Sequence, residues 1–393
     1  MEQVRGSEAV RPRTLAATSG GLHVVVVVLA ACLPLRATIS EYPISTMAAA
    51  ALVVLAAFHR PTVTGRVPRL AALALIVLIL WMVGASTVLH GIEARRAANL
   101  LVLLGLVWVL GQGRIHPPSF VTGLALGWAG GIAHAVVTRD ESTYDGRITG
   151  FLGDPNGAGF VIVTLGCVLI AYARSTRRRT WPLWAFTGAA VALTLSRTSL
   201  FAFLAVTLWA LVAPRFGRWS SLAALVVSWP VYWWLVDVVR DTGFFAERAG
   251  SDQLRDRLMI VEGQMADQAG SFGLGLGTAH ATVNGTFLWF HNSFRALWVE
   301  GGVVALALLA IGLGALFWSI HEVPAARRNA WYEAAILAAM ICSINIGFSL
   351  TSVTMAVAVG MYVLYWRTSV ADPQEAPEVA RGSQGAEVAA RPW

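Results

Sequence analysis

The fold is decided by the segment from Pro230 to Trp298, PVYWWLVDVVRDTGFFAERAGSDQLRDRLMIVEGQMADQAGSFGLGLGTAHATVNGTFLWFHNSFRALW. It leaves a hydrophobic stretch, runs through a long polar and glycine-rich region, and reaches His291 and Asn292 just before the next hydrophobic stretch. Nearly all of the remaining chain is typical of bilayer-spanning helices, where polar groups are costly. We therefore expect the chemistry of the protein, and a lid over its active site, in this one long loop.

The composition sets the class of protein. The chain has 393 residues, of which 56% are hydrophobic and only 13% charged, so it predicts a polytopic membrane protein. A span needs about 20 apolar residues to cross a hydrocarbon core of about 30 Å, and about twelve such windows are present. They lie near residues 21–37, 44–58, 70–89, 97–111, 119–137, 157–173, 181–195, 198–212, 220–238, 294–317, 330–348 and 351–366.

The orientation follows from arginine, because the chain contains no lysine. If the N-terminus lies inside, the inner connections collect most of the arginines, which is the positive-inside pattern. The net charge of +7 then reflects topology and anionic headgroups, and no basic stripe interleaved with aromatic residues predicts a nucleic-acid partner. The expected segments are a cytoplasmic start (1–20), nine spans (21–238), an extracytoplasmic loop (239–293), three spans (294–368) and a disordered cytoplasmic tail (369–393).

Two further features bear on the class. The basic front and the valine run Val24–Val28 resemble a signal peptide, but no cleavage site followed by a soluble domain appears, so we expect a retained first span. Cys32, Cys167 and Cys342 all fall in apolar windows, which argues against disulfides or a metal cluster.

A set of arginines departs from the positive-inside rule and is expected near the outer surface. Arginine keeps its charge and presents a planar fork of donors, so such a set suits a phosphate or diphosphate at the outer leaflet. For any single member, a solvated loop charge paired with a nearby acid is the favoured interpretation. For the set as a whole we favour anion binding, because Arg147, Arg197 and Arg295 are expected at helix ends, where an idle charge is costly. The set comprises Arg36, Arg95, Arg96, Arg139, Arg147, Arg197, Arg240, Arg248, Arg255, Arg257 and Arg295.

Three groups of motifs occur in a fixed order. They are RITGFLGDPNGAGF from Arg147, TLSRTSL from Thr194, and the loop elements RDRLMIVEGQ, GSFGLGLG and HNSFRALWVEGG. Together they resemble the O-antigen ligase and O-antigen polymerase superfamily over roughly residues 147–302. The resemblance implies an all-α, GT-C-like bundle of about twelve spans in the bacterial plasma membrane, whose active site faces the extracytoplasmic side. It also implies transfer of a glycan from a polyprenyl-diphosphate carrier, such as undecaprenyl diphosphate, to a glycan, lipid or protein acceptor.

The resemblance implies that His291 is the catalytic or acceptor-orienting residue, with Asn292 in support. A neutral imidazole can accept the proton of an attacking sugar hydroxyl. An interfacial histidine bonded to Asn292 or Glu300 is the structural alternative. Glu300 is assigned to the catalytic residues, where it would orient His291 or hold an arginine. The structural alternative is that Glu300 is only a buried ion-pair partner.

The resemblance further implies that Arg147, Arg197 and one or both of Arg255 and Arg257 bind the diphosphate. Fixed guanidinium groups can stabilise the charge that grows on the departing diphosphate, and Arg197 is therefore also counted as catalytic. No carboxylate pair or His/Cys spacing of a metal site is present, so we predict metal-independent transfer with no cofactor.

The remaining site assignments are supporting ones. Residues 252–267 have apolar side chains at helical spacing and predict an amphipathic helix, lying either on the bilayer or packed within the loop. Gly275 and Gly277 allow close backbone approach to a ligand. Asp154 or Asn156 is expected to cap the span that follows, with a further supporting role in the site.

Two other classes remain possible. A transporter or flippase of lipid-linked sugars would also have many spans, but such proteins place polar residues at mid-membrane in two related halves. A peptidoglycan glycosyltransferase of the shape, elongation and division type would use a similar donor, but its acidic catalytic loop is not recognisable. The sequence thus favours an inverting glycosyltransferase of surface polysaccharide assembly, with membrane lipids around it.

Overall fold

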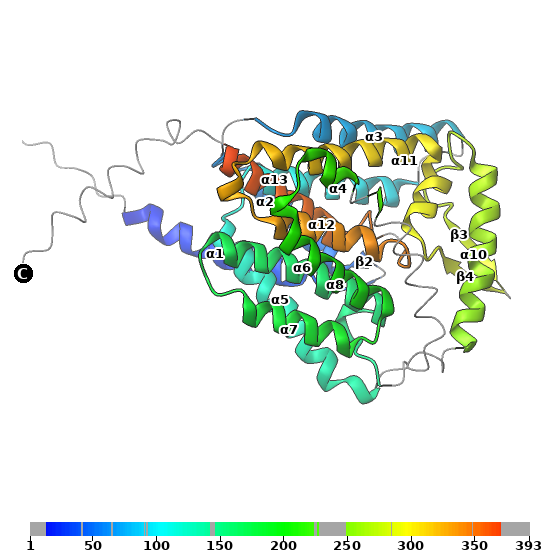
Figure 1. The fold of residues 1–393 in the computed structure, drawn as a ribbon, viewed down its shortest axis with the longest axis horizontal. Coiled ribbons are helices and arrows are strands. Elements are labelled where there is room, and N and C mark those ends of the chain that lie inside the picture. The colour runs from blue at the N-terminus through cyan, green and yellow to red at the C-terminus, as the bar shows by residue number, and fades with distance from the viewer. Residues whose placement is uncertain are drawn as a thin grey trace, which may run out of the picture.

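The described part of the protein is a bundle of helices with two short β-hairpins (Figure 1). The computed structural model describes residues 13–40, 42–63, 66–89, 91, 93–141, 146–223, 226–227, 249–283, 285–347 and 349–370. The helices are α1 (Arg13–Cys32), α2 (Ile44–Ala57), α3 (Arg69–Leu89), α4 (Ala94–Gly111), α5 (Pro117–Val137), α6 (Pro155–Ser175), α7 (Trp181–Leu193), α8 (Arg197–Val212), α10 (Ala249–Ala269), α11 (Ser293–Ser319), α12 (Ala330–Cys342) and α13 (Val353–Val370). The hairpins pair β1 (Thr38–Ile39) with β2 (Tyr42–Pro43), and β3 (His280–Val283) with β4 (Thr286–Trp289), both antiparallel.

The helices are those of a membrane protein. Within the described residues, seven are long and apolar enough to cross a bilayer, and four shorter apolar helices accompany them. The all-helical membrane class expected from the sequence is therefore present. The predicted span near residues 220–238 and the predicted tail 369–393 lie largely outside the described residues, apart from the first turn of that span and the end of α13.

Most predicted windows agree closely with helices, but the structure differs from the prediction at the start of α1 and between α12 and α13. Helix α1 begins at Arg13, inside the segment predicted to precede the first span. The windows 330–348 and 351–366 correspond to α12 and α13, which end and begin at Cys342 and Val353. Residues 343–352 thus form a connection of turns and bends, described except for position 348, where the sequence had predicted almost continuous helix.

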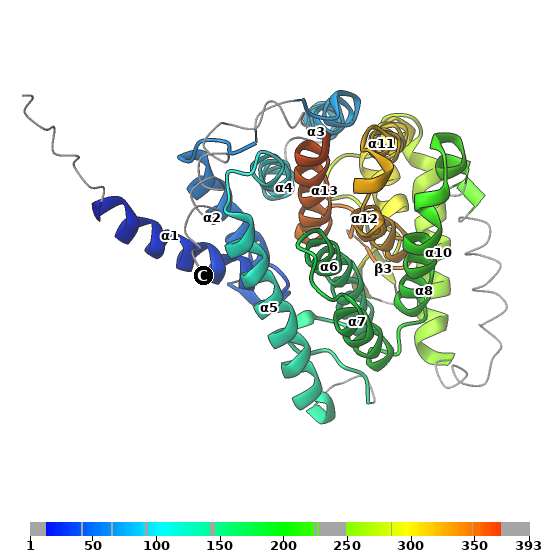
Figure 2. The ribbon, with the colours of Figure 1, turned by 60° about the vertical axis from the view of Figure 1, so that its left-hand side comes forward.

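The bundle packs around α6, α12 and α13. Most residues of each of these three helices are buried, whereas α3 and α11 pack on each other at one side and α1 and α5 at the other. Figure 2 shows α13, α12 and α6 in the middle of this arrangement. Helix α6 and helix α13 are apolar around their whole circumference because neighbouring helices surround them, as expected for central helices.

Helix α10 runs across one end of the bundle beside the β3–β4 hairpin (Figure 1). It packs on α11 and on β3, and its buried residues include Leu258, Ala266 and Ala269. Alternation along the hairpin places Ala281 and Val283 in the same apolar cluster. The helix predicted over 252–267 is therefore confirmed, and we call this end of the molecule the α10 end.

The loop before the hairpin and helix α11 meet at two glycines. Gly302 has φ +71°, a conformation that L side chains rarely adopt, and it kinks α11. A Cβ on Gly302 would collide with the carbonyl of Ser271, and one on Gly273 would lie 2.6 Å from the Glu300 carbonyl. The absence of side chains here lets the loop backbone lie directly against α11.

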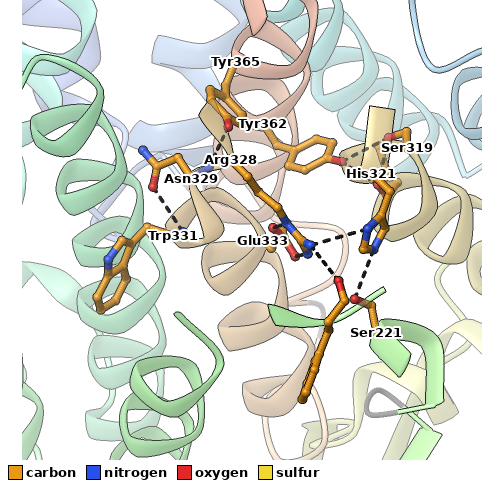
Figure 3. A network of polar contacts seen from close by, with 11 residues as sticks. Ser221, Ser319, His321, Arg328, Asn329, Trp331, Glu333, Tyr362 and Tyr365 are labelled. Atoms are coloured by element: carbon orange, nitrogen blue, oxygen red, sulfur yellow. Dashed lines mark hydrogen bonds and ion pairs between the residues drawn. The ribbon is translucent and has the colours of Figure 1, made fainter. Parts of the chain in front are cut away.

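The opposite end of the bundle is joined by a buried polar network (Figure 3). Arg328 donates to both carboxylate oxygens of Glu333, at 3.0 and 2.8 Å, and to the carbonyl of Phe216. His321 contacts Ser221 at 3.1 Å, while Tyr365 donates to the Arg327 carbonyl. The network connects the ends of α11, α12 and α13. Its buried ion pair, Arg328–Glu333, has further hydrogen-bond partners such as the Phe216 carbonyl, as a buried pair requires.

Candidate functional site

His291 lies at the α10 end, between β4 and the start of α11. Its backbone N–H donates to the Glu262 carboxylate at 2.6 Å, and its Nδ1 lies 3.3 Å from the carbonyl of Trp289. Because a carbonyl only accepts, this contact favours the tautomer with the proton on Nδ1. The lone pair of the ring then resides on Nε2, which is the arrangement that a general base requires.

Asn292 caps α11. Its side-chain oxygen accepts the backbone N–H groups of Phe294 and Arg295 at 2.9 and 3.0 Å. An asparagine in this position satisfies donors that have no partner inside the helix. The cap fixes where α11 begins relative to His291.

Glu262 was missed by the sequence reasoning, and it is fully buried in α10. Besides accepting the His291 N–H, its carboxylate lies 3.5 Å from the Arg295 guanidinium. Burial raises the pKa of Glu262, while the bonds from His291, Arg295 and Asn292 oppose that rise. The signal available in the sequence was a glutamate four residues after the buried Leu258, on the face that the spacing assigns to the interior.

Glu300 is buried in the first part of α11 and pairs with an arginine. Arg96 of α4 lies 3.3 Å from its carboxylate and also donates to Thr351 at 3.1 Å. The backbone N–H of Gly277 donates to the same carboxylate at 3.1 Å, and that of Gly275 donates to the Glu300 carbonyl. These contacts agree with the alternative in which Glu300 forms a buried ion pair with an arginine.

Gly275 and Gly277 are thus directed toward Glu300. Both have positive φ, +99° and +82°, so their N–H groups point in a direction that other residues reach only with strain. The sequence predicted that these glycines approach a ligand; in the structure their N–H groups donate to the protein's own Glu300 instead.

Arg147 lies at the start of the loop before α6. Its Nε donates to the Thr194 carbonyl at 2.9 Å, and its Nη2 lies 3.5 Å from the side-chain oxygen of Asn156. Asp154 caps α6 by accepting the N–H groups of Asn156 and Gly157, both at 3.1 Å. The expected capping role is confirmed, with Pro155 as the first helical residue.

Arg197 is the first residue of α8. Ser196 caps this helix, and the neighbouring Thr198 accepts the side-chain N–H of Asn345 at 2.9 Å. Arg147 donates to the Thr194 carbonyl in the turn that leads into α8, so both arginines are attached to this turn. Arg257 lies on the exposed face of α10, and the side chain of Arg255 is outside the described part of the chain.

Apart from Arg255 and Arg257, the predicted residues fall into three groups, joined by the connection Ser343–Ser352. Ser293, next to the His291–Asn292 pair, donates its N–H to the Ser343 carbonyl and accepts the Ser349 N–H, both at 2.8 Å. Asn345 reaches the Arg197 turn, and Thr351 reaches the group of Arg96 and Glu300. The sequence signal was a decapeptide, SINIGFSLTS, that is unusually rich in serine, threonine and asparagine between two apolar spans.

An apolar cavity of about 170 Å³ opens between α3, α4, α11 and α13. It extends along the bundle from Gln112 and Arg367 toward the α10 end, where Leu297 and Thr351 border it. Thr351 therefore belongs both to this cavity and to the group of Arg96. Among the described residues, no cluster of three or more His, Cys, Asp or Glu side chains could hold a metal ion.

Comparison of the chain with protein-family models and with curated protein sequences finds no significant match.

Proposed function

We propose that the protein is an integral membrane glycosyltransferase that moves a glycan from a polyprenyl-diphosphate carrier to an acceptor hydroxyl. The observation that carries the proposal is the setting of His291, whose Nδ1 faces a carbonyl, at the end of the bundle that also holds Arg96, Arg147 and Arg197. A base beside several fixed cations suits a reaction in which a hydroxyl loses a proton and a diphosphate leaves. The ordered motifs of the sequence support the same class.

The proposed reaction is a direct displacement. The acceptor hydroxyl attacks the anomeric carbon, its proton passes to Nε2 of His291, and the bond between that carbon and the diphosphate oxygen breaks. The electron pair of this bond leaves with the diphosphate, whose growing charge the guanidinium groups of Arg147 and Arg197 stabilise. Attack on the side opposite the leaving group inverts the anomeric centre.

The proposed membrane frame has about twelve spans, with the α10 end facing the extracytoplasmic side of the bacterial plasma membrane. The arginines of the opposite end, such as Arg66, Arg114, Arg174 and Arg215, support this orientation by the positive-inside rule. The apolar cavity beside Thr351 supports a lipid donor, because a polyprenyl chain needs an apolar surface that begins near the cationic groups.

The test is transfer from a synthetic polyprenyl-diphosphate-linked glycan by purified protein in EDTA. We expect turnover by the wild type and a loss of about 10²-fold or more in His291→Ala and Arg197→Ala. His59→Ala and Arg60→Ala, which change the same residue types just after α2 at the opposite end, should retain activity. Equal activity in all variants would remove His291 and Arg197 from the mechanism.

Transport of lipid-linked sugar is the competing function, and the same protein in proteoliposomes distinguishes it. Movement of the donor across the bilayer, with no transfer to any acceptor offered, would overturn the proposal in favour of a flippase.

A further inference from the structure

The α10 end contains a buried acid that the displacement above does not use. Glu262 is 0% exposed, although α10 is the most polar of the long helices. Its first oxygen accepts the N–H of His291 at 2.6 Å, and its second lies 3.5 Å from Nη1 of Arg295. A carboxylate in such a position is stable only when hydrogen-bond donors surround it.

The closest of these donors is the backbone N–H of His291, the residue assigned to the base. A peptide group whose N–H is held by a buried carboxylate has little freedom to rotate, because the direction of that N–H is fixed. Glu262 therefore fixes the backbone from which the His291 ring extends.

Other contacts already attach α10 to the bundle. Leu258, Ala266 and Ala269 share an apolar cluster with Phe290, Ala296 and Val299. The Nη1 of Arg295 that lies 3.5 Å from the carboxylate also donates to the carbonyl of Met259, at 2.9 Å. A helix held in this way does not need a buried acid to remain in place, so the acid serves the segment that it touches.

We propose that Glu262 is the positioning residue of His291: it holds the peptide group of His291 so that Nδ1 meets the Trp289 carbonyl and Nε2 faces the acceptor hydroxyl. The inference rests on the proposed function for its catalytic consequence and on the contacts above for its geometry. A misplaced base costs rate rather than binding, since displacements of about 1 Å at a reacting group can cost about 10²-fold.

The experiment compares Glu262→Ala, Glu262→Gln and Asp267→Asn in the full-length protein. Glutamine keeps an oxygen that can accept the His291 N–H, whereas alanine leaves this N–H without the carboxylate acceptor. Asp267 is an exposed acid on the same helix, so its neutralisation is the matched control for charge. Three readouts are needed: kcat and KM for the lipid-linked donor, amide hydrogen exchange of residues 290–293, and the unfolding temperature.

We expect Glu262→Ala to lower kcat by about 10²-fold with KM changed less than about threefold, and to exchange faster at residues 290–293 alone. Glu262→Gln should stay within about tenfold of the wild-type kcat, and Asp267→Asn should match the wild type. Unchanged exchange at residues 290–293 in Glu262→Ala, or an equal loss of kcat in all three variants, would overturn the proposal.

Failure of the proposed function gives a different pattern. If the wild type transfers no glycan, the function is wrong, and local exchange in Glu262→Ala still decides whether Glu262 holds the His291 segment. If Glu262→Ala unfolds globally, the test rests on Glu262→Gln. Native exchange at residues 290–293 together with a retained kcat in Glu262→Gln supports the inference. A kcat of Glu262→Gln as low as that of His291→Ala overturns it.

Discussion

The guanidinium of Arg96 lies 3.3 Å from the carboxylate of Glu300, which joins residues 204 positions apart in the chain. Glu300 is almost completely buried, and its remaining oxygen accepts the N–H of Gly277. The pair therefore links α4, α11 and the glycine-rich loop at one point. Charges buried in this way are mutually dependent, since either one alone would be left in a medium of low dielectric constant.

We predict that Arg96→Leu lowers the free energy of unfolding by about 3–5 kcal/mol, because it leaves the Glu300 carboxylate buried without its cation. The double variant Arg96→Leu/Glu300→Leu should lose less than Arg96→Leu alone. Denaturation of the purified protein in detergent measures both, with Arg60→Leu as the exposed control. A double variant that is less stable than Arg96→Leu would show that the pair is not the source of the effect.

The cap of α6 gives a second prediction. Asp154→Ala should destabilise the protein by about 1 kcal/mol, because two N–H groups at the start of the helix lose their acceptor. Asp154→Asn should retain most of this stability. Arg36→Ala tests the alternative that the 3.5 Å ion pair with Arg36 matters more, and we expect a loss below about 0.5 kcal/mol because both side chains are about 40% exposed.

The kink in α11 gives a third prediction. Gly302→Ala adds a Cβ against the Ser271 carbonyl at a residue with φ +71°, so it should cost about 2 kcal/mol or more. Gly314→Ala in the same helix meets no atom within 4 Å and should be neutral or slightly stabilising. Unfolding temperatures of the two variants check this, and equal values would contradict a requirement for glycine at the kink.

The buried acid in α10 gives a prediction about pH. Burial raises the pKa of Glu262 above its ordinary value of 4.5, so the folded protein binds this proton more tightly than the unfolded chain does. The stabilisation from protonation is fully present below pH 4.5 and is lost as the pH rises through the raised pKa. Glu262→Gln cannot titrate, so the unfolding temperature of the wild type relative to Glu262→Gln should fall over that interval.

A relative unfolding temperature that rises with pH over the same interval would mean that the bonds from His291, Asn292 and Arg295 outweigh burial. Asp267→Asn, which removes an exposed carboxyl from the same helix, is the control for general effects of charge.

Much of the helical bundle could be predicted from the sequence, because long apolar windows leave few other structures. The windows near 44–58, 70–89 and 119–137 agree with α2, α3 and α5 to within a residue or two at each end. The break between α12 and α13 could not be predicted in this way. Ile344, Ile346 and Leu350 alternate with polar residues there, and a window average hides the change.

The candidate site also has one part that could be predicted from the sequence and one part that could not. Capping by Asp154 follows from local chemistry and was predicted, whereas the contacts of Glu262 and Glu300 depend on which segments meet in space. A sequence shows that Glu262 lies on the apolar side of a helix. It does not show that His291, 29 residues later, returns to the same place.

The connection Ser343–Ser352 has a consequence for how the protein is made. Synthesis delivers the segments of Arg96, Arg197 and His291 before it delivers the ten residues that join them. Membrane proteins insert their helices in order, and contacts between distant segments form late. The α10 end can therefore reach its final arrangement only when the last helical pair has been inserted, so a chain arrested before Ser343 would hold the three groups without the bonds that connect them.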